Sequence, residues 1–166
     1  MNVLKKRGAL PALAFLIPAV LLLIIFAANG VTPFGGRSLA EQDANIQYIE
    51  FFNYYRNLFR GEDTLLYSFT NFLGGSGVAL FAYYLASPLN LLILAVPASM
   101  NHALFSLLVL LKLSLAGLTM SIFLTKRFPS LSPLYALLLS VSYALMQYDF
   151  AQTMNIMWLD GVYMLP

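Results

Sequence analysis

The chain has 166 residues, of which 60% are hydrophobic and 10% charged, and its mean hydropathy is +0.78. Soluble domains carry about 25% charged residues, so this composition excludes an ordinary soluble domain and indicates an integral membrane protein. A net charge of +2, without a basic cluster among aromatics, gives no support for nucleic-acid binding. The absence of cysteine excludes disulfides, thiol catalysis and cysteine-bound zinc.

The first long apolar run, residues 9–28, follows the basic residues Lys5, Lys6 and Arg7. About 20 apolar residues cross the hydrocarbon core, and positive charge keeps the preceding terminus in the cytoplasm. A cleaved signal peptide is the alternative, but its apolar core is normally about 7–15 residues long. The pattern therefore predicts an uncleaved spanning helix with a cytoplasmic N-terminus.

Residues 29–101 are predicted to form an outer loop, because they contain five acids and three arginines but no lysine. Within this loop, Ser38 and Glu41 fit the S-x-x-E capping box and predict a helix over residues 39–60. Its apolar face comprises Ile46, Ile49, Phe52, Tyr55 and Phe59, and its polar stripe comprises Asp43, Gln47, Glu50 and Tyr54. This two-faced pattern predicts a helix lying on the membrane surface.

Residues 78–98 are long and apolar enough to cross a membrane, but Pro88 interrupts the run near its middle. The next two apolar runs, residues 103–124 and 131–148, are predicted spans with a Lys-Arg pair between them. Because positive loops prefer the cytoplasm, this pair is on the expected side only if residues 78–98 do not cross. We therefore predict that residues 78–98 form two short half-buried helices bent at Pro88.

Residues 149–166 are predicted to lie outside again, and they end within what reads as a further apolar segment. The chain is therefore expected to be a fragment of a longer protein. The predicted fold is an all-α membrane protein, a polytopic helical bundle with three completed transmembrane spans. A juxtamembrane amphipathic helix and a re-entrant or half-buried segment complete this single membrane domain.

Five short stretches of the sequence, taken in order, resemble the bacterial membrane-protein family called YfhO. They are D-x-x-x-QY-x-x-FF at 43–52, YSF…LGGSG at 67–77, YYLASPLNLL at 83–92, LLKLSLAG at 110–117 and MWLDGVYMLP at 157–166. The resemblance covers nearly the whole chain and corresponds to the N-terminal part of longer family members. It implies a multi-pass glycosyltransferase of the GT-C architecture in the bacterial plasma membrane.

Enzymes of this architecture take a sugar from a polyprenyl-phosphate carrier at the outer face of the membrane. The acceptor that the resemblance implies is a cell-envelope polymer of the teichoic-acid type. If the chain is a fragment, it is expected to be inactive by itself.

The resemblance also implies a catalytic aspartate in the first outer loop, and Asp43 stands at that position. A base there would take the proton of the acceptor hydroxyl. Aspartate is also a favoured N-cap residue, so the alternative is that Asp43 only starts a helix. The capping box at Ser38 argues against this alternative, because it places Asp43 inside the helix.

Three basic side chains are candidates for binding the donor phosphate: Lys112, Arg37 and His102. Lys112 lies near the middle of its span, where a lysine must be paired, so it either faces donor phosphate or forms a structural pair with an acid. Arg37 could hold phosphate with two hydrogen bonds, and His102 could contact phosphate or simply be tolerated at the membrane boundary. Arg56 and Arg60 are interpreted as anchors at headgroup level.

Asp149 and Asp160 lie on the same outer side as Asp43 in this topology. Together they could hold a divalent cation, Mg²⁺ or Mn²⁺, although nothing in the sequence requires a cofactor. The alternative is that Asp149 only marks the end of the third span.

The alternative function is a non-enzymatic polytopic membrane protein, such as part of a transporter or an assembly subunit. Lys112 and the bent segment 78–98 fit that interpretation equally well. It leaves unexplained why acids gather beside an amphipathic aromatic helix.

Overall fold

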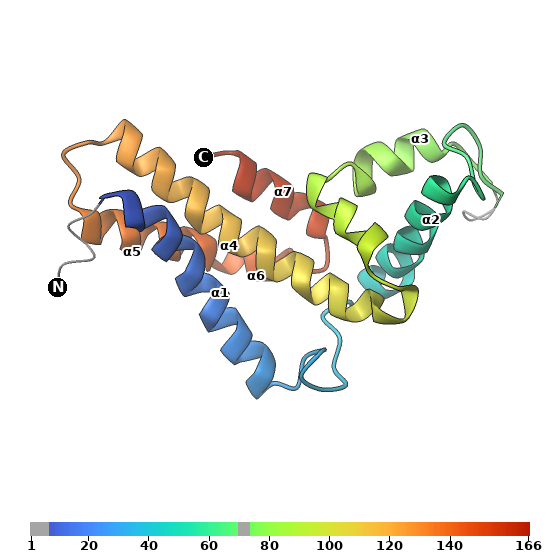
Figure 1. Ribbon diagram of the computed structural model, residues 1–166, viewed down its shortest axis with the longest axis horizontal. Helices are drawn as coiled ribbons and strands as arrows, with labels where there is room; N and C mark the ends of the chain where they lie inside the picture. The colour runs from blue at the N-terminus through green and yellow to red at the C-terminus, as the bar shows by residue number, and fades with distance from the viewer. Residues whose placement is uncertain (1–6, 70–73) are drawn as a thin grey trace. The chain divides into compact units, whose positions relative to one another are not determined.

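The computed structural model of the protein describes residues 7–69 and 74–166, which form helices, turns and two isolated β-bridges (Figure 1). The α-helices are α1 (Leu10–Ala28), α2 (Ile49–Arg60), α3 (Gly77–Leu80), α4 (Asn101–Arg127), α5 (Pro133–Ala144), α6 (Gln147–Ala151) and α7 (Ile156–Met164). Short 3-10 or π segments are η2 (Arg7–Ala9), η3 (Ala44–Tyr48), η4 (Phe81–Leu85), η5 (Pro88–Ala95) and η6 (Ala98–Met100). The predicted all-α architecture is thus confirmed for these residues. Lys5 and Lys6 of the predicted cytoplasmic signal, and residues 70–73 of the YSF…LGGSG stretch, lie outside the described residues.

Among the described residues, two helices are long and apolar enough to cross a membrane. They are α1, with 19 residues, and the continuous helix Ala98–Arg127, with 30 residues. They contain the first two predicted spans, residues 9–28 and 103–124, so both runs form helices of spanning length.

The third predicted span, residues 131–148, is divided in the structure. Its main helix α5 has 12 residues and is about 18 Å long, well short of the roughly 30 Å hydrocarbon core. The chain leaves helical geometry at Leu145 and Met146 before α6 begins. No glycine or proline occurs at this break, so the apolar sequence does not predict it. A complete third crossing stays a prediction.

The described residues form two compact units. One combines the chain up to Arg37 with Val109–Pro166, and the other is Ser38–Leu108. Helix α4 begins in the second unit and ends in the first. Each unit has its own buried residues.

The first unit packs α1 against α5 around a small apolar core (Figure 1). The core residues are Leu10, Ala14, Leu124, Ala136 and Leu137. Gly117 of α4 lies at the tightest approach, because a Cβ atom there would overlap the backbone oxygen of Ala14 and lie 3.3 Å from the Cβ of Ala144. Small residues therefore allow α1, α4 and α5 to come close together, as is common for helices in membranes.

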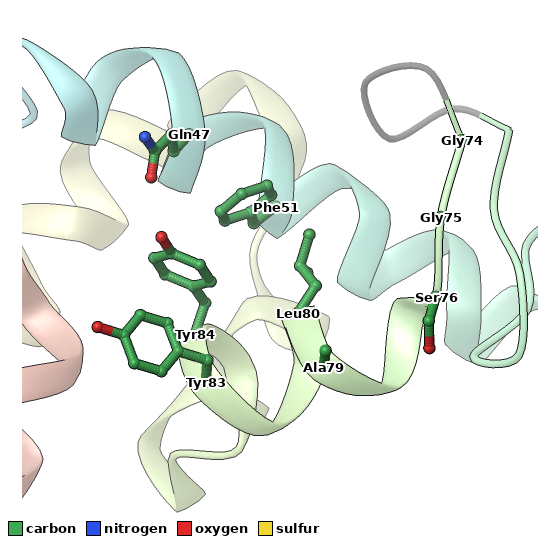
Figure 2. Close-up of a pocket in the computed structure, with 9 residues that line it drawn as sticks. All are labelled: Gln47, Phe51, Gly74, Gly75, Ser76, Ala79, Leu80, Tyr83 and Tyr84. Carbon is green, nitrogen blue, oxygen red and sulfur yellow. The ribbon is translucent and has the colours of Figure 1, made fainter.

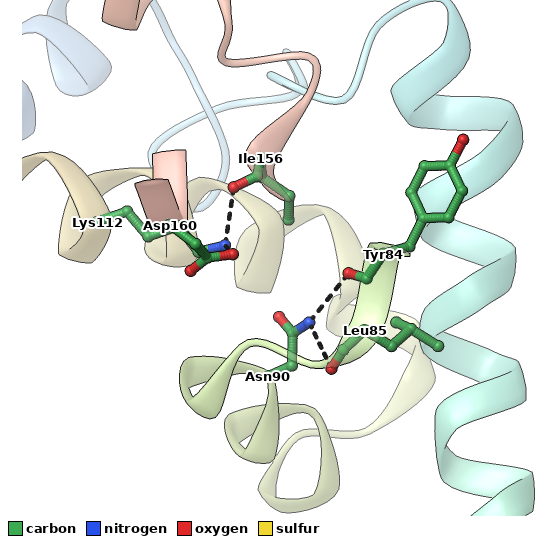
Figure 3. A network of polar contacts seen from close by, with 6 residues as sticks. All are labelled: Tyr84, Leu85, Asn90, Lys112, Ile156 and Asp160. Atoms are coloured by element: carbon green, nitrogen blue, oxygen red, sulfur yellow. Dashed lines mark hydrogen bonds and ion pairs between the residues drawn. The ribbon is translucent and has the colours of Figure 1, made fainter. Parts of the chain in front are cut away.

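The second unit contains a helical hairpin that bends by 101° between Gly77–Leu85 and Pro88–Ala95. The bend lies where Pro88 predicted it, and Ser87 before the proline is extended, as the proline ring requires. The Nδ2 of Asn90 donates to the carbonyls of Tyr84 and Leu85 at 3.3 and 3.2 Å (Figure 3). These carbonyls lie at the end of a helix, where no further turn can bond them, so Asn90 stabilises the bend.

The helix predicted over residues 39–60 begins later than the capping box indicates. The Oγ of Ser38 accepts from the backbone N–H of Ala40 at 3.0 Å and bonds the Nδ1 of His102 at 2.8 Å. Gln42 then has a positive φ of 47°, and regular helical structure starts at Asp43 and η3. The capping-box prediction is therefore wrong, because residues 39–42 do not form the first turn of a helix; Ser38 instead contacts His102, which is distant in sequence.

The apolar face that the sequence predicts to contact lipid is divided in the structure. Ile46 is 72% and Phe59 58% exposed, as a lipid-facing surface would be, whereas Phe52 and Tyr55 are buried against protein. Tyr48, which the predicted face omits, is buried with its ring 5.9 Å from that of Phe105. The helix packs within its own unit through aromatic side chains on more than one side, so it does more than lie on a lipid surface.

Arg56 is not a headgroup anchor, because its side chain is buried in this unit and hydrogen-bonds neighbouring segments. Its guanidinium donates to the carbonyls of Ile93 and Val96 at 3.0 and 2.8 Å and to the Oδ1 of Asn101 at 2.8 Å. Two longer bonds reach Phe52 O and Asn53 Oδ1 at 3.3 and 3.4 Å. Since buried donors without partners are unfavourable, this set of acceptors explains how a charged side chain that is 6% exposed is tolerated.

Candidate functional site

Asp43 is an exposed residue at the start of the helix formed by η3 and α2. It already has helical backbone angles, and its carboxylate makes no capping hydrogen bond. The N-cap alternative would require the side chain to accept an N–H of the first turn. The geometry therefore does not support the capping role and leaves the carboxylate facing solvent.

A cavity of about 360 Å³ lies beside this helix (Figure 2). It is lined by Gln47, Phe51, Gly74, Gly75, Ser76, Ala79, Leu80, Tyr83 and Tyr84. Residues from the η3–α2 helix, from the loop before α3 and from the α3–η4 helix thus converge on one space, all within the second unit.

The aromatic rings of this cavity are arranged by contacts with one another. The Phe51 and Tyr84 centroids are 4.9 Å apart, and the Tyr83 and Tyr84 centroids are 4.8 Å apart in an edge-to-face geometry. Tyr84 also meets Tyr48 edge-to-face at 5.5 Å. Such offset geometries are the favoured ones for aromatic pairs, so Tyr84 is held on three sides.

Asp43 belongs to the surroundings of this cavity. It precedes the cavity residue Gln47 by one helical turn, a spacing that brings two side chains to the same side of a helix. Burial raises the pKa of the Tyr84 hydroxyl, and the nearby groups Tyr83 and Asp43 raise it further. A solvent-exposed carboxylate and an aromatic cavity are therefore neighbours.

Gly74 has a positive φ of 94° and shapes the rim of the cavity. A Cβ atom at this position would lie only 2.6 Å from the hydroxyl oxygen of Tyr67, so only glycine fits both the backbone angle and the space. The backbone N–H of Gly75 donates to Ser68 O at 3.0 Å, which leaves it engaged within the loop.

His102, a predicted phosphate ligand, bonds the Oγ of Ser38 through Nδ1 at 2.8 Å. Arg37, another predicted ligand, is exposed, and the contacts that define its position are made by its backbone with Gly30 and Thr32. The structure does not test whether either side chain meets phosphate, and both assignments stay predictions.

Lys112, the third predicted phosphate ligand, is engaged inside the first unit (Figure 3). Its Nζ donates to the Oδ2 of Asp160 and to the carbonyl of Ile156, both at 2.8 Å. The lysine is 1% and the aspartate 17% exposed. Of the two roles that the sequence left open, this geometry favours the structural pair.

The two aspartates of the predicted metal site have different surroundings. Asp160 bonds Lys112, whereas Asp149 is fully buried and neither of its carboxylate oxygens has a hydrogen-bond partner among the described residues. Within residues 7–69 and 74–166, no group of three His, Cys, Asp or Glu side chains could hold a metal ion. Nothing in this geometry adds support to a cation shared by Asp149 and Asp160.

The aromatic residues of the cavity were not among the predicted site residues. In the sequence, Gln47 belongs to the polar stripe and Tyr83 to the YYLASPLNLL stretch, and neither pattern indicates a role in binding. Their convergence depends on how the α3–η4 helix folds back on α2, which no local spacing encodes. The sequence feature that indicates this aromatic cavity is the pair of adjacent tyrosines, Tyr83 and Tyr84, shortly before Pro88.

The comparison with protein families agrees with the resemblance seen in the sequence. The family model described as bacterial membrane protein YfhO matches residues 14–166. No curated protein and no solved structure matches the chain. Because the family match extends over most of the sequence, and because the described residues are helical with two helices of spanning length, the chain belongs to the YfhO family of bacterial membrane proteins.

Proposed function

We propose that this protein takes part in transferring a sugar from a polyprenyl-phosphate carrier to a cell-envelope polymer of the teichoic-acid type, at the outer face of the membrane. Asp43 is the proposed general base. The observation that carries the proposal is an exposed carboxylate that caps no helix and adjoins an aromatic cavity of about 360 Å³. Membership of the YfhO family supports a membrane setting for this chemistry.

In the proposed step, a hydroxyl oxygen of the acceptor forms a bond to the anomeric carbon of the sugar. The bond from that carbon to the phosphate oxygen breaks, and its electron pair leaves with the polyprenyl phosphate. Asp43 takes the hydroxyl proton, which makes the attacking oxygen more nucleophilic. No oxidant, reductant or further reactant is needed for this balance.

The leaving phosphate also needs compensation of its growing negative charge. Lys112 is not proposed for this task, because its ammonium group already bonds Asp160 and Ile156. His102, which lies in the same unit as Asp43, is proposed instead, and the phosphate role of Arg37 stays a prediction.

The proposal is tested by replacing Asp43 with asparagine in the full-length protein and measuring sugar on the extracted envelope polymer. Asparagine keeps the size of the side chain but cannot accept the proton, so transfer should fall about 100-fold or more while protein levels in the membrane stay unchanged. The matched control is Glu41→Gln, which removes the same charge from another exposed residue of the same segment. Normal transfer by Asp43→Asn would remove Asp43 as the base.

A non-enzymatic role, such as part of a transporter or an assembly subunit, is the second candidate. The hairpin bent by 101° favours it, because discontinuous helices line substrate paths in many transporters. That function should be indifferent to Asp43→Asn, so this variant separates the two candidates.

A further inference from the structure

We propose that the cavity between the η3–α2 helix and the α3–η4 helix is a subsite for one saccharide ring, with Tyr83 as the surface on which the ring stacks. This inference rests on the proposed function, because it names the part of the substrate that binds beside Asp43. It concerns only residues of the second unit.

The size of the cavity fits a single ring. Its volume of about 360 Å³ lies near the lower end of the roughly 300–1,000 Å³ that small-molecule sites occupy. A cavity of this size takes one sugar unit and leaves the rest of a carrier or polymer outside.

The lining contains no charged side chain among its nine described residues. A phosphate group in this space would lose its hydration without gaining a cation, which is strongly unfavourable. The same lining is not purely apolar, since the Gln47 amide and the Ser76 and tyrosine hydroxyls carry donors and acceptors. A neutral ligand with both an apolar face and several hydroxyl groups matches it better than a phosphate or an alkyl chain does.

Tyr83 supplies the apolar surface. It is 56% exposed, although its ring is in edge-to-face contact with Tyr84, which is itself packed on Phe51. Figure 2 shows Tyr83 and Tyr84 side by side on the same helix, with Phe51 across the space from them. The face of a sugar ring exposes C–H groups with weak positive charge, and these are attracted to the negative face of an aromatic ring.

Gln47 supplies the hydrogen bonds that an apolar surface cannot. Its amide offers both a donor and an acceptor, and Figure 2 shows it on the side of the cavity where the Tyr84 hydroxyl lies. Gln47 is also the cavity residue one helical turn from Asp43. A ring stacked on Tyr83 and bonded to Gln47 would therefore have one edge near the carboxylate.

The experiment measures equilibrium binding of D-glucose, D-galactose and N-acetyl-D-glucosamine to the purified full-length protein by ligand-observed NMR. The detergent must lack a sugar headgroup, because such a headgroup would compete for the site. D-Sorbitol is the ligand control, since it has the hydroxyl groups of a hexose but no ring. The expected result is that at least one hexose binds and sorbitol does not.

Variants assign the binding to the cavity. Tyr83→Leu removes the aromatic face and should weaken hexose binding about 5- to 10-fold, whereas Tyr83→Phe keeps the ring and should retain it. Tyr135→Leu is the matched control, because Tyr135 is 62% exposed and lies in α5, outside the cavity. Absence of binding for all three hexoses, or equal losses for Tyr83→Leu and Tyr135→Leu, would overturn the inference.

Failure of this inference is distinguishable from failure of the proposed function. Hexose binding is measured without turnover, and it should persist in Asp43→Asn, whose transfer activity is expected to be lost. If Asp43→Asn abolishes transfer but no hexose binds, the base assignment stands and the subsite does not. In the transfer assay, Tyr83→Leu should raise the KM for the carrier-linked donor if the ring is the donor sugar, and the KM for the polymer if it belongs to the acceptor.

Discussion

The ammonium nitrogen of Lys112 on α4 lies 2.8 Å from a carboxylate oxygen of Asp160 on α7. The carbonyl of Ile156, the first residue of α7, accepts a second bond from the same nitrogen at 2.8 Å. The lysine is 1% exposed, so the pair replaces the water that a charged group would otherwise need. The pair therefore connects α7 to the apolar helix α4 within the first unit.

This pair makes a prediction about single and double substitutions. Asp160→Leu alone leaves a buried ammonium without its counter-ion and should lower stability by about 3–5 kcal/mol. Lys112→Met combined with Asp160→Leu removes both charges and should recover most of that loss. Thermal unfolding of the detergent-solubilised variants measures both. If the double variant is less stable than Asp160→Leu, the pair is not a structural one.

Gly117 makes a prediction about helix packing. A methyl group there would overlap the backbone oxygen of Ala14, so Gly117→Ala should force α1 and α4 apart and cost about 1–3 kcal/mol. The matched control is Gly161→Ala in α7, where nothing lies within 4 Å of an added Cβ and where alanine should stabilise the helix by up to about 1 kcal/mol. Opposite shifts in melting temperature are expected, and an equal rise for both variants would contradict the close contact.

The parts of the fold that sequence patterns predicted are those that depend on local chemistry. Two runs of about 20 apolar residues form long helices because the backbone must bond within itself in lipid. The bend at Pro88 follows from the missing N–H and the ring of proline. Such features need no knowledge of what packs against them.

The parts that patterns missed depend on contacts between segments that are distant in sequence. Ser38 bonds His102 while the chain after it stays non-helical up to Gln42, and Arg56 donates to Ile93, Val96 and Asn101. The sequence at the break after α5 contains no glycine or proline, the residues that commonly end a helix. Contacts between segments distant in sequence determine these features of the fold.

The candidate site also combines a residue that the sequence indicates with a cavity that it does not. Asp43 is exposed, and the catalytic role that the family resemblance implies for it stays a prediction. The cavity beside it requires Phe51 and Tyr84 to meet across two helices, and only the folded unit brings them together. Sequence patterns can therefore nominate a reactive group more readily than the surface that binds its substrate.

Residue 130 offers a test of membrane orientation. The chain has no cysteine, so Ser130→Cys introduces one thiol, at an exposed position after the basic end of α4. If the hairpin of residues 77–95 does not cross, an impermeant maleimide should label this thiol only after the cells are permeabilised. Glu62→Cys, at an exposed position in the predicted outer loop, is the control and should be labelled in intact cells. Labelling of Ser130→Cys from outside would mean that the hairpin crosses.

Asp149 makes a prediction about pH. It follows the predicted third span, is fully buried and has no hydrogen-bond partner for its carboxylate among the described residues. Burial raises the pKa of this carboxyl to about 7, whereas an exposed aspartate titrates near 3.9. Between these values the folded protein holds a proton that the unfolded chain has released. Its contribution to stability is therefore fully present below about pH 4, declines as the pH rises toward 7 and is lost above it.

Asp149→Asn isolates this contribution, because asparagine has nearly the same size and does not ionise. Melting temperatures of the wild type and the variant should be compared from pH 4 to pH 8, so that other titrating groups cancel in the difference. The variant should gain stability relative to the wild type as the pH rises, with most of the change between about pH 5 and pH 7. A constant offset caused by the buried amide is compatible with this expectation, since it would be the same at every pH. A difference that does not change with pH would show that Asp149 keeps the same protonation state in the folded and unfolded protein.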